Sequence, residues 1–246
     1  MYQSIKYRVK TKIIELSMKN RYLDKIVGGI RDKRRDNRVN PNLAKDAGSV
    51  LELVRSSGLK LFPMFGTLLS IYRDGKFIYA DDYDFALMPG EKLDFKVINS
   101  MANKGAKLVA FSLVGNDLVE FSFEYEGIRI DIFKLDYYDD KVCHRCPNFR
   151  TDRPKIDFSE LTIKEYSTYF EVEYPKITFY FDEFWGFYIP ENCEDIFERH
   201  YGLDWNIPKQ TNFIDYKNYR FIRKQSFNVS GHHSLLEVEV MERIYD

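Results

Sequence analysis

The chain has 246 residues, a net charge of −1, 44% hydrophobic residues and 30% charged residues. This balance is typical of a folded globular protein and excludes a wholly disordered chain. No apolar run approaches the ~18 residues that a membrane-spanning helix needs, so we expect no integral membrane protein.

The first 40 residues form a basic arm, with twelve Lys or Arg against four Asp or Glu and a net charge of +8. Apolar residues recur in residues 1–40 at roughly helical spacing, which predicts a basic amphipathic helix. The arm lacks the continuous apolar core of a secretory signal, and the chain has three cysteines, so a cytoplasmic location is expected. The arm is expected to contact an anionic membrane surface peripherally or to pack on the domain of residues 41–246.

The hydrophobic pattern of the remaining chain predicts alternating helices and strands. The first half is predicted to hold helices at residues 42–58, 68–72 and 95–104, and strands at 59–65, 77–88, 107–113, 118–125 and 128–135. The second half is predicted to be irregular at 136–158, to hold strands or aromatic-packed loops at 163–188, a short helix at 191–200, and a strand or helix at 235–244.

Two aspartates lie two positions apart in the predicted strand at 77–88. Because alternate residues of a strand share a face, Asp82 and Asp84 point the same way, with Cα atoms roughly 7 Å apart. Two carboxylates on one face repel each other and resist burial. A divalent cation removes both costs, and ligation by oxygen alone favours Mg²⁺ or Mn²⁺ over zinc.

A third carboxylate, Asp131, lies in the later predicted strand at 128–135. If that strand lies beside the first, three carboxylates can hold one or two Mg²⁺ ions that bind a substrate diphosphate. Asp81 is the weaker candidate, because it faces away from its two neighbours.

The dipeptide Gly66-Thr67 stands between a predicted strand and a predicted helix. A glycine there lets backbone N–H groups approach a phosphate, and the helix N-terminus favours an anion. The Thr67 hydroxyl can cap the helix or bond a phosphate oxygen. Each motif alone has a common structural explanation: a solvated loop, a helix cap or an edge residue. Their order along the chain is that of the nucleotidyltransferase fold, which favours the functional interpretation.

Three segments, taken in order, resemble the LicD/fukutin family of phosphotransferases. The first block includes Gly66-Thr67-Leu68-Leu69, Arg73 and Asp81-Asp82-Tyr83-Asp84, the second is Ile130-Asp131-Ile132-Phe133, and the third is Tyr201-Gly202-Leu203-Asp204-Trp205. The departures from the family pattern are at Ser70, Ala80 and Tyr83, and they leave the three carboxylates intact.

The resemblance implies a nucleotidyltransferase-like fold, α/β or α+β, with a mixed β-sheet flanked by helices. It also implies transfer of phosphocholine, ribitol phosphate or glycerol phosphate from a CDP-activated donor to a hydroxyl of a cell-surface or lipid-linked glycan, with release of CMP. By position, the metal-binding and catalytic carboxylates are Asp82, Asp84 and Asp131, the last being the candidate general base. The donor-binding candidates are Gly66, Thr67, Arg73 and Trp205.

Several alternatives stay open at this point. Arg73 suits a surface ion pair as well as a phosphate contact, and Trp205 suits core packing as well as stacking on a base or sugar. Cys143 and Cys146 have zinc-type spacing, with Cys193 as a further ligand, but a zinc site needs four. An NTP-using nucleotidyltransferase is the alternative function, and a catalytically inactive binding module is a third. No motif indicates nucleic-acid binding.

Overall fold

The largest sheet of the protein has seven strands in the order β1-β2-β5-β4-β3-β13-β8, and all neighbours are antiparallel except β2 and β5. The computed structural model describes residues 43–77, 82–150, 160–209 and 213–245. The predicted basic arm and Asp81 therefore lie outside the described residues. In sheet order, the strands are β1 (Leu61–Pro63), β2 (Asp82–Leu87), β5 (Ile128–Phe133), β4 (Asp117–Tyr125), β3 (Lys107–Val114), β13 (Ser226–Ser230) and β8 (Thr162–Tyr166).

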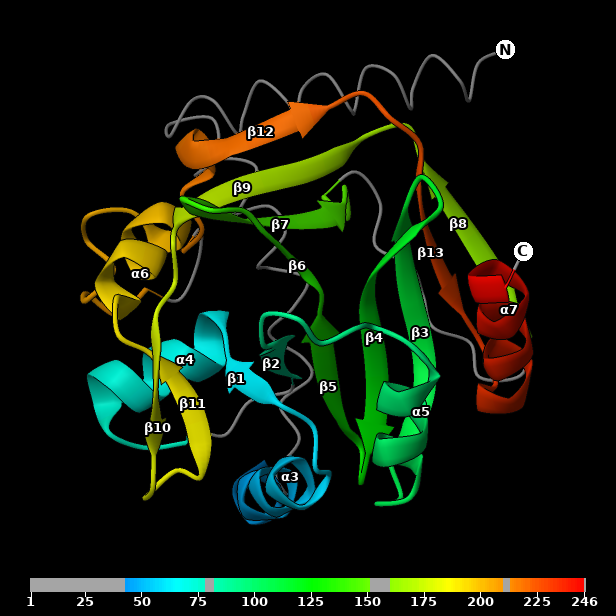
Figure 1. The fold of residues 1–246 in the computed structure, drawn as a ribbon, viewed down its shortest axis with the longest axis horizontal. Coiled ribbons are helices and arrows are strands. Elements are labelled where there is room, and N and C mark those ends of the chain that lie inside the picture. The colour runs from blue at the N-terminus through cyan, green and yellow to red at the C-terminus, as the bar shows by residue number, and fades with distance from the viewer. Residues whose placement is uncertain (1–42, 78–81, 151–159, 210–212, 246) are drawn as a thin grey trace.

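A second sheet of four strands stands across one end of the first, and a separate two-stranded hairpin lies beside β1 (Figure 1). The four-stranded sheet has the order β12 (Tyr219–Ile222), β9 (Tyr169–Pro175), β7 (Lys141–Pro147) and β6 (Leu135–Tyr137). The hairpin pairs β10 (Phe179–Asp182) with β11 (Phe187–Pro190). Residues 163–188 were predicted to hold strands or aromatic-packed loops, and the structure places β8 to β11 there.

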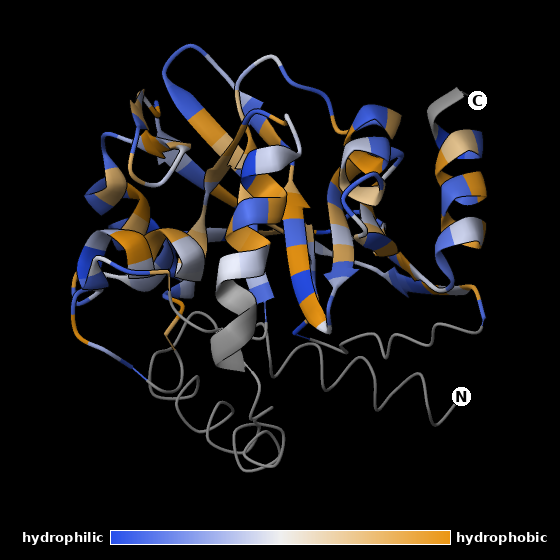
Figure 2. Ribbon diagram, turned by 90° about the horizontal axis from the view of Figure 1, so that it is seen from below, coloured by the Kyte–Doolittle hydropathy of each residue, from blue (hydrophilic) through white to orange (hydrophobic). Residues whose placement is uncertain are grey.

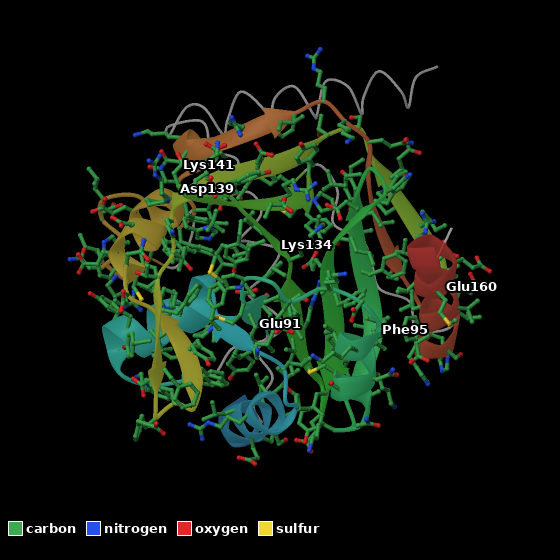
Figure 3. The ribbon with its side chains drawn as sticks, in the orientation of Figure 1. Glu91, Phe95, Lys134, Asp139, Lys141 and Glu160 are labelled. Atoms are coloured by element: carbon green, nitrogen blue, oxygen red, sulfur yellow. The ribbon has the colours of Figure 1, made fainter. Side chains whose placement is uncertain are left out.

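The chain crosses from the first sheet to the second at Lys134, between β5 and β6 (Figure 3). Its ammonium group donates to Asp117 of β4 at 2.7 Å, and Arg145 of β7 pairs with the same carboxylate. The prediction of an irregular segment at 136–158 is wrong in its first part, because β7 lies there. The sequence of β7 does not alternate between polar and apolar residues. Val142, Cys143 and His144 are all buried in succession, and Arg145 is neutralised by carboxylates of neighbouring strands.

Helices flank both sheets, so the predicted α/β class, a mixed sheet flanked by helices, is confirmed. The helices are α3 (Leu43–Ser56), α4 (Phe65–Asp74), α5 (Phe95–Ala102), α6 (Cys193–Tyr201), α7 (His233–Tyr245) and the 3₁₀ turn η1 (Tyr216–Asn218). Helix α4 packs on β2 and α6, whereas α5 and α7 both pack on β3. The helices carry both hydrophobic and hydrophilic bands (Figure 2), as expected where one face meets the core. Among the described residues, no helix combines the length and the apolar character needed to cross a membrane.

Helix α4 begins three residues earlier than predicted, at Phe65. This residue has a φ of +45°, a left-handed conformation that is uncommon without glycine. The preceding residue, Met64, is extended and offers no side-chain cap, so the first N–H groups of the helix are not capped by a side chain. The helix ends at Asp74, two residues later than predicted, and the left-handed conformation of Gly75 lets its N–H bond Ser70 O.

Candidate functional site

Strands β2 and β5 are parallel neighbours, and this pairing brings the predicted aspartates together. Asp84 is the register partner of Asp131, and Asp82 is the partner of Arg129. Register partners on neighbouring strands project from the same face of a sheet. The opposite face of β2 holds Tyr83 and Phe85, which are both buried. The expectation that the strand of Asp131 lies beside the DxD strand is therefore confirmed.

Thr67 fixes the backbone of β2 at the centre of this cluster. The N–H of Asp84 donates to Thr67 Oγ1 at 2.9 Å, and Asp84 O accepts from Met64 N at 2.9 Å. Thr67 is only 3% exposed, so its oxygen acts inside the protein. The structure thus gives the Thr67 hydroxyl a partner that the sequence did not indicate, while phosphate binding by Thr67 stays a prediction.

We expect Thr67→Val to lower the free energy of unfolding by about 1–3 kcal/mol, because it leaves the buried N–H of Asp84 without an acceptor. Urea unfolding of the two proteins measures this difference. Thr67→Ser keeps the oxygen and serves as the matched control, with a stability close to wild type. Equal stability of the valine and serine variants would show that the bond contributes nothing.

The carboxylates are close enough to change each other's protonation. Burial first, and then the charges of Asp82, Asp131 and Glu120, raise the pKa of Asp84 well above its usual value of 3.8. Burial, followed by the charge of Asp131, raises the pKa of Glu120 to about 7. A group of titratable side chains with raised pKa values is a feature of functional sites as well as of internal ion networks.

Two charged residues of this cluster, Glu120 and Arg129, were not proposed from the sequence. Arg129 donates from Nε to Asp131 Oδ1 at 2.7 Å, and Glu120 is 3% exposed on β4. Their signal is visible in retrospect: Glu120, Ser122 and Glu124 alternate with apolar residues, so one face of β4 is polar. Burial acts to lower the pKa of Arg129, but the charges of Asp131 and Glu120 have the larger effect and raise it.

The donor chemistry of the three aspartates fits a hard divalent cation, since carboxylate oxygens are the ligands that Mg²⁺ and Mn²⁺ prefer. The like charges that raise the pKa of Asp84 would be neutralised by such an ion. In the described parts of the chain, no three His, Cys, Asp or Glu side chains are already gathered to ligate one ion. Asp82, Asp84 and Asp131 are the residues that would hold the cation.

A cavity of about 270 Å³ lies along one side of α4, from Gly66 in its first turn to Arg73 in its last. Its lining includes Gly66, Arg73, Tyr201, Trp205, Lys209 and Phe213. Three of the four predicted donor-binding residues therefore line one cavity, and Thr67 lies behind it. Gly66 lines this cavity and the next residue, Thr67, accepts from the N–H of Asp84, so the cavity lies near the strand of the carboxylates. Burial first, and then the charge of Asp84, raise the pKa of Tyr201 well above its usual value.

Arg73 and Trp205, which each had a structural and a ligand-binding interpretation, make contacts within the fold and also line the cavity. Arg73 donates two bonds of 2.9 Å to Asp74, and its side chain also lines the cavity. The ring of Trp205 packs 5.0 Å from that of Phe197, and its remaining surface lines the same cavity. Lys209, which was not predicted, adds a second cation and donates to Asp204 at 2.6 Å.

The three cysteines are free thiols in the structure. Cys143 and Cys146 lie three residues apart on β7, and odd spacing on a strand places side chains on opposite faces. Cys193 begins α6, where its Sγ donates to Pro190 O at 2.9 Å. Burial raises the pKa of both Cys143 and Cys193 to about 12. The arrangement of the first two cysteines therefore disfavours a shared zinc ion.

Two buried histidines, His144 and His200, contact the strained residue at the start of α4. Their rings lie 5.1 Å and 4.4 Å from that of Phe65. His200 Nδ1 bonds the hydroxyl of Tyr219, whereas His144 Nε2 is buried without a hydrogen-bond partner. Burial is the main cause that lowers the pKa of each histidine to about 3. Both rings are therefore neutral at physiological pH and pack as part of the core.

No protein family model matches the sequence, and no curated protein matches it. The family resemblance, with the activity and substrates that it implies, therefore stays a prediction.

Proposed function

We propose that the protein is a metal-dependent phosphotransferase that moves a phospho-substituted alcohol from a CDP-activated donor to a glycan hydroxyl. The observation that supports this most is the register of β2 and β5, which sets Asp84 beside Asp131 on one face, with Asp82 two residues away. The resemblance to the LicD/fukutin family supplies the substrate classes. Phosphocholine, ribitol phosphate and glycerol phosphate are the groups proposed for transfer.

The cavity beside α4 is the proposed donor site. The first N–H groups of α4 have no side-chain cap, and an uncapped helix N-terminus binds phosphate. A Cβ atom added to Gly66 would meet nothing within 4 Å, so the backbone there is open to a ligand. Lys209 and Arg73 add positive charge, and the rings of Trp205 and Phe213 offer flat surfaces for a base or sugar.

In the proposed reaction, the acceptor hydroxyl attacks the β-phosphorus of the donor, a new O–P bond forms, and the bond to the bridging oxygen breaks to release CMP. Asp131 takes the hydroxyl proton as general base. Asp82 and Asp84, with Asp131 beside them, would hold the cation, which would neutralise the diphosphate charge. Thr67 holds the backbone of Asp84, and Arg73 contacts phosphate at the cavity wall.

The experiment that tests the proposal is a donor screen with product analysis. CDP-choline, CDP-ribitol, CDP-glycerol and NTPs are compared with Mg²⁺ by thermal shift, since a ligand that binds the folded state raises Tm. We expect a CDP-linked donor to bind and to yield CMP when a glycan acceptor is added. Pyrophosphate released from an NTP would instead identify an NTP-using nucleotidyltransferase, and binding without turnover would identify a binding module.

We expect Gly66→Leu to raise the donor KM by at least about tenfold, about 1.4 kcal/mol of lost binding, with little change in stability. The new side chain enters the cavity, while the open space around this position leaves the fold undisturbed. Steady-state kinetics and urea unfolding measure the two effects. Gly48→Leu on α3 is the matched control, because a Cβ there also meets nothing within 4 Å and the residue is exposed. An unchanged KM in the Gly66 variant would contradict the donor site.

A further inference from the structure

A line of buried polar side chains crosses three neighbouring strands behind the proposed metal site. Asn228 of β13, Ser112 of β3 and Glu120 of β4 are register partners in turn. Asn228 Nδ2 donates to Ser112 Oγ at 3.2 Å, and Ser112 Oγ donates to Glu120 Oε2 at 2.7 Å. All three are almost fully buried. One carboxylate oxygen of Glu120 is therefore held in a fixed place inside the sheet.

The other oxygen of Glu120 faces the guanidinium of Arg129, at 4.0 Å from Nη2. The same guanidinium bonds Asp131 through Nε at 2.7 Å and Ser122 through Nη2 at 2.7 Å. Arg129 is also the register partner of Asp82. Its single positive charge therefore stands between a proposed metal ligand on one side and Glu120 on the other.

The position of the Arg129 guanidinium determines how much of the negative charge of the aspartates is left to attract a cation. A positive charge bonded to Asp131 competes with a divalent cation for the same carboxylate and repels it. A buried carboxylate such as Glu120 is costly unless a cation pairs with it. Glu120 is therefore a second binding position for the guanidinium, with Oε1 at 4.0 Å from Nη2.

We infer that Glu120 is a positioning residue of the proposed metal site: it attracts the Arg129 guanidinium and so frees Asp131 to bind a divalent cation. The inference rests on the proposed function and deepens it. Ser112 holds Glu120 in place, and Ser122 holds Arg129 within reach of both carboxylates. When a cation binds the aspartates, mutual repulsion moves the guanidinium toward Glu120.

The test is Mn²⁺ binding to the full chain, measured by isothermal titration calorimetry in a double-mutant cycle. We expect Glu120→Gln to weaken Mn²⁺ binding by about 10- to 100-fold, the usual effect of losing a partner behind a metal ligand. In the Arg129→Gln background, the same change should alter affinity by less than about twofold, because no guanidinium is left for Glu120 to attract. Glu165→Gln, at an exposed carboxylate on β8 of the same sheet, is the control and should bind as wild type does.

Urea unfolding of the metal-free variants separates positioning from a merely structural role. We expect Glu120→Gln to be at least as stable as wild type, because it removes a costly buried charge. Affinity lost equally in both backgrounds would overturn the inference, since Glu120 would then act directly through its charge. Unchanged affinity with lower stability would also overturn it. If wild type itself binds no Mn²⁺, the proposed function fails together with the inference, which is a distinguishable result.

Discussion

If the proposed function holds, replacing Asp84 by asparagine should lower the transfer rate by about a thousandfold or more, because ligation and charge neutralisation at the proposed metal site would contribute several kcal/mol to stabilising the transition state. The same variant should unfold at a higher temperature than wild type at neutral pH. An inactive protein with a more stable fold is the behaviour expected when a charge is kept for function at a cost to stability.

The expected stabilisation follows from the direction of the pKa shift. The pKa of Asp84 in the folded protein is raised, first by burial and then by Asp82 and Asp131. The folded state therefore holds this proton more tightly than the unfolded chain does, and the stability gained below pH 3.8 is lost as pH rises through the folded pKa. Asparagine carries no charge at any pH. The Asp84→Asn variant should therefore exceed wild type in stability most at pH values above the folded pKa of Asp84.

Kinetics with the CDP-linked donor and a thermal melt at neutral pH measure both effects. The control is again Glu165→Gln, which removes an exposed carboxylate from the far edge of the same sheet and should change neither property. An Asp84→Asn protein that keeps a near-normal rate would remove Asp84 from the proposed site. One that is inactive but strongly destabilised would indicate a structural role.

Acid should destabilise the protein steeply because of His144 and His200. Burial lowers the pKa of each from 6.5 to about 3, so the unfolded chain takes up protons that the folded protein resists. Stability is therefore fully present above pH 6.5 and lost as pH falls from 6.5 toward 3. For two such groups, the loss is on the order of several kcal/mol.

Urea unfolding across pH 4 to 7 measures how stability changes with pH. The variant His144→Phe removes one of the two histidines that take up a proton on unfolding. Phenylalanine suits the site, because His144 packs between the rings of Phe65 and Phe133 and its Nε2 has no partner. We expect the variant to lose less stability on acidification, whereas His232→Gln, at an exposed position, should follow wild type. Identical slopes for all three proteins would contradict the explanation.

Glu120 changes the stability of the protein with pH in the opposite direction to the two histidines. Burial and the charge of Asp131 raise its pKa to about 7 in the folded protein. The stability that it contributes when protonated is lost as pH rises through 7. This loss extends from pH 4.5 to about 7 and overlaps the range in which the histidines lose stability on acidification, so Glu120 makes the net dependence of stability on pH less steep there.

Local periodicity was enough to predict the site's framework. Alternation predicted that Asp82 and Asp84 share one face of their strand, and the parallel pairing of β2 with β5 sets Asp131 beside Asp84, as expected if the two strands are neighbours. These features depend on residues close in sequence, or on two strands with strong apolar faces.

The features that were missed depend on contacts between distant segments. The role of Glu120 is defined by Ser112 and Arg129 on neighbouring strands, and no local pattern indicates which carboxylate a guanidinium will approach. Strand β7 was predicted as irregular because its polar residues hid the alternation, and Arg145 is neutralised only by carboxylates of other strands. Tertiary context overrides local propensity in such places.

Anomalous diffraction from crystals grown with Mn²⁺ and CDP tests the central claim most directly. We expect a manganese peak within ligand distance of the carboxylate oxygens of Asp82, Asp84 and Asp131, with the diphosphate bound beside Gly66. A manganese ion located elsewhere, or a diphosphate bound away from these three side chains, would contradict it.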